Sequence, residues 1–170
     1  MSKIKIFALG GLNENGKNMY VVEVNKDIFV FDAGLKYDND INLGIDYIIP
    51  NIDYLIKNRK RIKGIFLTHG HEGNMGATPD VLEQLPEVPV YGTKLTLEMV
   101  AKDIDRSIAN KVKLIEIKPH IKLNFGKNSI FPISVTHSIP DAVCYVLYTP
   151  DGAIVYTGDF VFDSTMQGTY

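Results

Sequence analysis

The sequence predicts an α/β protein built on a mixed β-sheet with helices on one face. Two observations support this fold class. Short apolar runs rich in Val, Ile, Phe and Tyr recur along the chain, and Gly, Asn, Asp and Pro bound them, as is typical of strands. Three segments in the middle of the chain instead carry helical signals, so helices interrupt the series of strands.

The apolar runs predict the strands in order. We expect strands at residues 4–9, 19–24, 28–32, 64–68, 88–91, 113–117, 130–136, 142–148 and 153–157. Residues 25–27 and 150–152 combine Asn, Asp, Pro and Gly between neighbouring runs, which predicts a hairpin turn at each place.

The first helix is expected from Asp53 to about Arg61, and the third begins at Thr93 in "TKLTLEMVAKDI". The second helix has the clearest start signal, in "TPDVLEQL". Thr78 suits the N-cap, Pro79 suits the first helical position, and the carboxylate of Asp80 favours the positive end of the helix dipole.

The composition is that of an ordinary globular domain. The 170 residues fit one domain with a real core, and 45% of them are hydrophobic and 22% charged. The formal net charge of −2 gives no overall basic footprint for nucleic acid, although a local patch would be enough. The basic run "KNRKRIK" at residues 57–63 is interpreted as a solvated helix end rather than an RNA contact.

The single cysteine, Cys144, excludes an internal disulfide and fits a reducing cytosol. The first residues, "MSKIKIFALGG", are too short and polar for a signal peptide, and no apolar run approaches the ~20 residues of a membrane span. We therefore expect a cytoplasmic protein without a membrane partner.

Four predicted strands end in residues that commonly bind metals. Asp32 follows one, His69 and His71 follow the next, and His137 and Asp159 follow two later ones. Side chains at strand ends are aimed by a rigid scaffold, and two histidines two residues apart in extended backbone point to the same side. Three imidazoles and a carboxylate would make a zinc shell, so the spacing predicts a metal site or a former one.

Other polar residues near these motifs have less defined roles. Asp32 is either a turn residue before Ala33 or an acceptor that orients a ligand histidine, and both interpretations stay open. Glu72 alternates away from the two histidines, which favours a solvent-facing or supporting role over direct ligation. The fourth histidine, His120, lies in a polar turn and is expected at the surface.

The motifs "THGHEGN", "VTHSIPD" and "YTGDF" resemble the metal motifs of the metallo-β-lactamase superfamily. The stretches "ALGGLNENGKNMYVVEV", "FDAGLKY", "LGIDYIIPNIDYL" and "HSIPDAV" narrow the resemblance to the ribonuclease J family, along essentially the whole chain. That family reads H-x-H-x-D-H at the first motif, whereas Gly73 and Asn74 stand here at the last two positions. This departure resembles the weakly active second paralogue of Gram-positive bacteria.

The resemblance carries residue roles over by position. His69, His71, His137 and Asp159 match the first metal site, with Asp159 as the residue that would bridge two metals. Asp32 matches a supporting aspartate that would orient a ligand. Gly73 and Asn74 would be degenerate positions of the second metal site. At most one ion per chain is expected, zinc or manganese, and an empty site is left open.

The resemblance also implies the architecture and the function. The fold would be an α+β sandwich of metallo-β-lactamase type, with residues 1–170 forming its N-terminal half and with the β-CASP and C-terminal domains outside this chain. The expected function is RNA processing and decay by a 5′–3′ exonuclease and endonuclease family, with weak catalysis and none in this piece alone. The alternative is a non-catalytic scaffold that partners an active ribonuclease J paralogue. A thioester hydrolase on the same fold is a third class, which "HSIPD" disfavours. RNA, a paralogous subunit and self-association are the expected partners.

Overall fold

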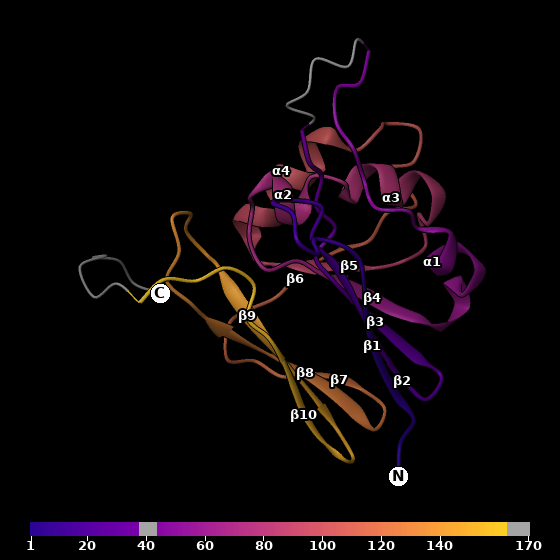
Figure 1. Cartoon of the computed structure of the whole chain (residues 1–170), viewed down its shortest axis with the longest axis vertical. Helices are drawn as coiled ribbons and strands as arrows, with labels where there is room; N and C mark the ends of the chain where they lie inside the picture. The colour runs from indigo at the N-terminus through magenta and orange to yellow at the C-terminus, as the bar shows by residue number, and fades with distance from the viewer. Residues whose placement is uncertain (38–43, 163–170) are drawn as a thin grey trace.

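The computed structural model describes residues 1–37 and 44–162, whose strands form two β-sheets packed against each other (Figure 1). The six-stranded sheet has the order β1-β2-β3-β4-β5-β6, and the four-stranded sheet has the order β10-β9-β8-β7. The strands of the first sheet are β1 (Ile4–Gly10), β2 (Met19–Val24), β3 (Asp27–Phe31), β4 (Ile62–Phe66), β5 (Val90–Gly92) and β6 (Leu114–Glu116). Those of the second are β7 (Leu123–Phe125), β8 (Asn128–Ser134), β9 (Val143–Thr149) and β10 (Gly152–Tyr156).

The first sheet is mixed, as the sequence predicts. β1, β2 and β3 pair antiparallel, while β3, β4, β5 and β6 pair parallel through helical crossovers. The second sheet is antiparallel throughout. The helices are α1 (Asp53–Lys57), α2 (Glu72–Met75), α3 (Thr78–Gln84) and α4 (Lys94–Asp103), and a 3₁₀ turn spans Arg59–Arg61.

Each face of the six-stranded sheet packs on a different layer, because side chains alternate along a strand. On β3, Ile28 and Val30 face a cluster that includes helix residues Leu55 and Val81. Phe29 and Phe31 face the second sheet instead. In Figure 1 the helices accordingly lie on one side of β1–β6, and the orange and yellow strands lie on the other.

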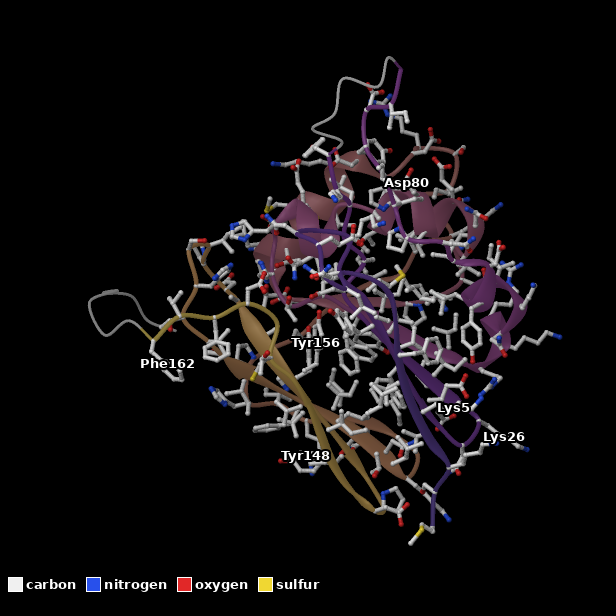
Figure 2. The ribbon with its side chains drawn as sticks, in the orientation of Figure 1. Lys5, Lys26, Asp80, Tyr148, Tyr156 and Phe162 are labelled. Carbon is white, nitrogen blue, oxygen red and sulfur yellow. The ribbon has the colours of Figure 1, made fainter. Side chains whose placement is uncertain are left out.

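Aromatic rings fill the space between the two sheets. Phe66 of β4 lies 5.8 Å from Tyr145 of β9, measured between ring centroids, in an edge-to-face arrangement. Phe31 stacks on Tyr156 of β10 at 5.3 Å. Figure 2 shows Tyr156 directed between the sheets, whereas Tyr148 lies on the outer side. These contacts fix the end of β10 against the end of β3, which matters for the site below.

The strand predictions are confirmed in existence and order, and four details of the prediction differ. The first helix, expected from Asp53 to about Arg61, ends at Lys57, and a separate 3₁₀ turn follows it. The expected mixed sheet is accompanied by a second sheet, and the short elements β7 and α2 were not anticipated. The prediction of Thr78 as N-cap is wrong, because α3 begins at Thr78 and Ala77 is its N-cap. Gly76 and Ala77 already have nearly helical backbone (φ −66°, ψ −23° and φ −86°, ψ 0°), so α3 follows α2 without the extended residue on which a capping side chain sits.

Within the described ranges 1–37 and 44–162, no helix has the length and apolar character needed to cross a membrane.

Candidate metal centre

The candidate residues meet at one edge of the molecule, where strands of both sheets end. Asp32 directly follows β3, and His69 and His71 follow β4, its parallel neighbour. The two sheets are joined at this edge, since the amide of Val143 donates to the carbonyl of Thr68 at 2.9 Å. The hydroxyl of Tyr145 also donates to the carbonyl of Leu67, at 2.7 Å. His137, which follows β8, is thereby brought to the histidines of the other sheet.

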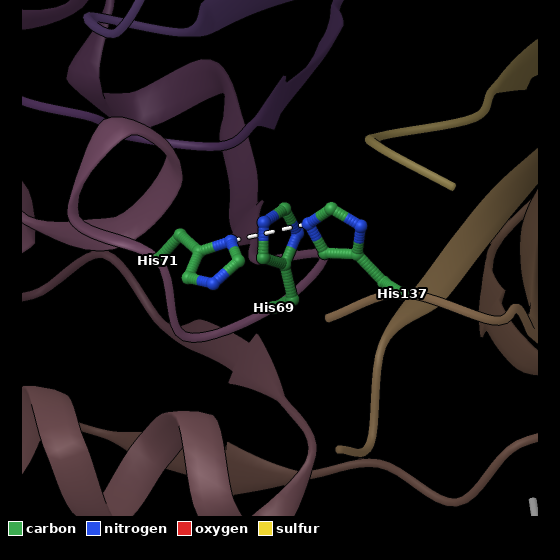
Figure 3. A group of neighbouring side chains, drawn as sticks. All are labelled: His69, His71 and His137. Atoms are coloured by element: carbon green, nitrogen blue, oxygen red, sulfur yellow. Dashed lines mark hydrogen bonds between the residues drawn. The ribbon is translucent and has the colours of Figure 1, made fainter. Parts of the chain in front are cut away.

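Three imidazoles converge at this edge (Figure 3). One ring nitrogen from each of His69, His71 and His137 lies within 4.8 Å of the others. His71 Nδ1 and His137 Nε2 are 3.1 Å apart. Two nitrogens bound at about 2.0–2.1 Å to a tetrahedral zinc ion stand about 3.3 Å apart, so these three rings need only small movements to surround an ion.

The state of the imidazoles suits metal binding. His69 is fully buried, and its Nε2 has no hydrogen-bond partner among the described residues; the same is true of the buried Nδ1 of His137. Burial, reinforced by the neighbouring His137 and His71, lowers the pKa of His69 to about 3. Burial also lowers the pKa of His137. Neutral imidazole is the form that binds a metal, and a buried nitrogen without a partner is costly, so the donor set fits a divalent ion.

Asp159 lies at the rim of the three histidines. Its Oδ2 is 3.8 Å from His69 Nε2, and its side chain is 54% exposed, whereas His69 is fully buried. The structure therefore brings together three of the four residues that the sequence analysis proposed as ligands, and the carboxylate of Asp159 lies beside His69 on the solvent side.

Asp32 is fully buried and stands at the turn position considered from the sequence, while its connection to a histidine is indirect, through Thr68. Its backbone has φ +60°, the left-handed conformation that a short polar side chain tolerates at a turn. Its carboxylate accepts hydrogen bonds from Thr68, whose hydroxyl also contacts His69 Nδ1 at 2.9 Å. Burial raises the pKa of Asp32 to about 7, against the opposing effect of its hydrogen-bond donors.

Two of those donors were not anticipated from the sequence. The amide of Asn74 and the hydroxyl of Tyr156 each donate to Asp32 Oδ2 at 2.9 Å. Tyr156 lies 124 positions from Asp32, and no local pattern indicates that contact. Asn74 was considered only as a degenerate metal position.

Positions 73 and 74 offer no ligand atom to the three histidines. Asn74 is 3% exposed, and its amide nitrogen is bonded to Asp32. Gly73 has no side chain, and a Cβ added there would meet the Cα of Gly16 at 3.2 Å. The backbone at position 73 therefore faces the loop that precedes β2.

The remaining candidates take structural or surface positions. Glu72 and His120 are exposed, as expected. The basic run is largely paired within the chain: Arg59 bonds Glu87, Arg61 bonds the buried Glu23, and a third pair joins Lys63 to Asp27. Three of the five cations of the run therefore join the α1–β4 connection to its neighbours, whereas the sequence predicted a solvated helix end.

Comparison with known proteins identifies the class. The sequence profile described as Metallo-beta-lactamase superfamily matches residues 12–166. The metallo-beta-lactamase fold protein YhfI from Bacillus subtilis superposes with a TM-score of 0.69 at 16% identity, covering 96% of this chain and 65% of that one. A protein of unknown function from Enterococcus faecalis V583 also gives a TM-score of 0.69, at 20% identity, covering 93% of this chain and 44% of that one. The chain belongs to the metallo-beta-lactamase superfamily, whose members bind metal.

More specific relatives are ribonucleases. The chain is 46% identical over 168 residues to Ribonuclease J 2 of Staphylococcus aureus strain MRSA252 and 45% identical to Ribonuclease J 2 of Staphylococcus epidermidis. Each alignment covers 98% of this chain and 30% of the relative, so the chain spans about a third of the relatives' length. The resemblance to ribonuclease J drawn from the motifs is confirmed, and the chain is homologous to one portion of those proteins.

Proposed function

We propose that this chain is the metal-binding N-terminal part of a ribonuclease J-type protein of RNA processing and decay, with weak or lost phosphodiester hydrolysis. One observation carries the proposal. Three imidazoles converge within 4.8 Å, while the two neighbouring positions that would complete a second metal site supply no ligand. The relatives named Ribonuclease J 2 indicate the substrate class, which is RNA.

The proposed centre holds at most one divalent ion per chain, zinc or manganese. His69, His71 and His137 would bind it through ring nitrogens, and Asp159 would close the shell from the solvent side. When bound, such an ion supplies a Lewis acid next to the scissile phosphate. The chain's own contribution is a rigid, neutral ligand set, because His69 is buried and held by Thr68.

Weak catalysis follows from what positions 73 and 74 lack. A pair of metals stabilises both the attacking and the leaving oxygen of an in-line displacement. Gly73 contributes no side chain, and the Asn74 amide is engaged by Asp32, so only one of these oxygens would be stabilised. RNA positioning would come from the rest of the longer protein, since three cations of the basic run, Arg59, Arg61 and Lys63, are paired within this chain.

The second candidate is a non-catalytic subunit that pairs with an active ribonuclease J paralogue. The Asn74–Asp32 hydrogen bond favours it, because the side chain at a former ligand position now stabilises the fold. Self-association is also part of this proposal. The one cysteine, Cys144, fits a reducing compartment, and we expect the protein to act in the cytoplasm.

Elemental analysis of the purified, dialysed chain tests the metal centre. We expect up to one equivalent of zinc or manganese, lost in His71→Ala and kept in His120→Ala, the matched change of an exposed histidine. Two tightly held equivalents, or the same metal content in both variants, would contradict the proposed site. RNA decay by the full-length protein, compared with its His71→Ala variant, separates weak catalysis from a scaffold without catalysis.

A further inference from the structure

The carboxylate of Asp32 is a junction of four donors from three other segments. The Thr68 amide donates to Oδ1 at 2.8 Å, and the Thr68 hydroxyl lies 3.0 Å from both carboxylate oxygens. Asn74 of α2 and Tyr156 of β10 donate to Oδ2, each at 2.9 Å. Helix α2 and both sheets are therefore tied to one buried acid group.

The position of one hydrogen in this network decides the state of His69. The Thr68 Oγ1 touches Asp32 on one side and His69 Nδ1, at 2.9 Å, on the other. A hydroxyl has a single hydrogen, and an ionised carboxylate, which is the form of Asp32 above its pKa of about 7, can only accept. While the hydroxyl donates to Asp32, its oxygen must accept from His69, so the proton of that imidazole sits on Nδ1 and the lone pair on Nε2.

The free lone pair points to the centre. His69 Nε2 is buried, has no hydrogen-bond partner in the described part of the chain, and lies 3.8 Å from Asp159 Oδ2. The opposite tautomer would place a hydrogen on Nε2 and leave no site for a metal there.

Asn74 and Tyr156 keep the carboxylate in place. Both bind Oδ2, the oxygen that the Thr68 amide does not hold. Without them the carboxylate can turn about its Cβ–Cγ bond, and the Thr68 hydroxyl then becomes free to donate to His69 instead. The amide of Asn74 is buried, and the one hydrogen bond of its nitrogen among the described residues goes to this carboxylate.

We propose that Asn74 is a positioning residue: with Tyr156, its amide holds Asp32 against Thr68, which fixes His69 as the Nδ1–H tautomer with Nε2 free to bind a metal. The ligand part of this inference rests on the proposed metal centre, whereas the tautomer is a property of the metal-free chain. Position 74 thus acts on the remaining metal site through two other residues.

Long-range ¹H–¹⁵N correlation spectra of the ¹⁵N-labelled, metal-free chain report the tautomer directly. At pH 8.5, where Asp32 is ionised, we expect a single Nδ1–H form of His69 in the wild type and a mixture of tautomers in Asn74→Ala. Thr68→Val, which removes the hydroxyl at nearly constant volume, should abolish the preference, and Thr68→Ser should restore it. The matched control is Asn128→Ala, because Asn128 is another buried asparagine that donates to a carboxylate, Asp27 at 3.1 Å, at the start of β8 rather than its end.

Zinc affinity, measured by competition with a chromophoric chelator, gives the second readout. Loss of a partner that orients a metal ligand costs 10- to 100-fold in affinity, so Thr68→Val should fall in that range. We expect Asn74→Ala to lose about tenfold, and Asn128→Ala and Thr68→Ser to stay within about threefold.

The two readouts separate this inference from the metal centre itself. An Nε2–H form of His69 in the wild-type chain would overturn the inference, whatever the metal content and whether or not the variants fold. Equal spectra and equal zinc affinities for Asn74→Ala and Asn128→Ala would overturn the role of Asn74. A chain that binds no zinc but shows the expected tautomers would refute the metal centre and support the inference.

Discussion

Replacement of Tyr156 by phenylalanine removes one hydroxyl from the buried network and leaves the ring in place. The ring stacks on Phe31 and belongs to the cluster between the sheets, so packing should be preserved. The lost bond runs from the hydroxyl to Asp32 Oδ2 at 2.9 Å. A hydrogen bond to an ionised group contributes about 1.5–3 kcal/mol, and one to a neutral group about 0.5–1.5 kcal/mol. The cost of Tyr156→Phe should therefore depend on the charge of Asp32.

The sign of this pH dependence follows from the raised pKa. Asp32 has a pKa of about 7 in the folded chain, against an ordinary value of 3.8 for an exposed aspartate, so the folded state binds its proton more tightly. This group stabilises the fold most below its unfolded pKa, and the contribution is lost as pH rises through 7. Tyr156→Phe raises the folded pKa further, by about one unit, because it removes a donor to the ionised form. The variant should lose about 2–3 kcal/mol at pH 8.5 but only about 1 kcal/mol at pH 5.5.

Urea denaturation of both proteins at the two pH values measures this difference. The folded-state pKa of His69 is lowered to about 3, so its contribution to the free energy of unfolding falls as the pH drops below the pKa of histidine in the unfolded chain. This contribution is the same in both proteins and cancels from the difference between them. Tyr20→Phe is the control, since the Tyr20 hydroxyl donates to the neutral carbonyl of Gly11 at 3.0 Å and its ring lies 5.3 Å from Tyr156. A loss in Tyr156→Phe that is the same at pH 5.5 and 8.5 would refute the argued charge of Asp32.

Three further predictions concern positions 73 and 74, the basic run at residues 57–63 and the four-stranded sheet. Gly73→Asp with Asn74→His should lower the free energy of unfolding by about 2–4 kcal/mol, because it crowds the facing loop and removes a donor to a buried acid. Calorimetric titration should nevertheless show metal stoichiometry above the wild type, and a stoichiometry of zero would contradict the site geometry. Arg61→Ala should cost about 2–3 kcal/mol in urea, since it leaves a buried glutamate without its guanidinium partner, whereas exposed Lys60→Ala should change stability by less than about 0.5 kcal/mol. Sedimentation velocity should show self-association through edge strand β10 that Val155→Lys, a change at a 57% exposed position, reduces; a monomer at high concentration would contradict this.

The sequence predicted best the strands that consist of a mostly apolar run with turn residues at its end. β2 was predicted with its observed bounds, Met19–Val24, because every one of its residues is apolar or flanked by apolar neighbours and turn residues follow it. The short strand β7 was not predicted, because its three residues, Leu-Asn-Phe, are too few to show the alternation of apolar and polar residues. Helix α2 was not predicted, because its four residues have no apolar face of helical period and follow directly on the loop that carries the histidines.

In the site, too, the contacts between residues close in sequence were predicted, and the contacts between distant segments were not. The spacing of His69 and His71 and their place after a strand predicted that they would lie together, and His137 joins them. The partner of Asn74 was not predictable, since it depends on how α2 buries its third and fourth residues, Asn74 and Met75. Tyr156 needed the packing of one sheet on the other, which no spacing within a single strand encodes.

The backbone around positions 72–74 is held in place independently of the side chains at positions 73 and 74, where the proposed function places a lost second metal site. The carbonyls of Glu72, Gly73 and Asn74 accept hydrogen bonds from Leu35, Asn18 and Ala33, at 2.9, 3.0 and 2.7 Å. None of these bonds involves a side chain of residues 72–74, so substitution there leaves the loop anchored on both sides. The amide of Asn74 adds a further bond to Asp32 that holds the same segment. Under the proposed function, ligands of a second metal could therefore be lost while the three histidines keep their geometry, because main-chain hydrogen bonds rather than these side chains fix the segment.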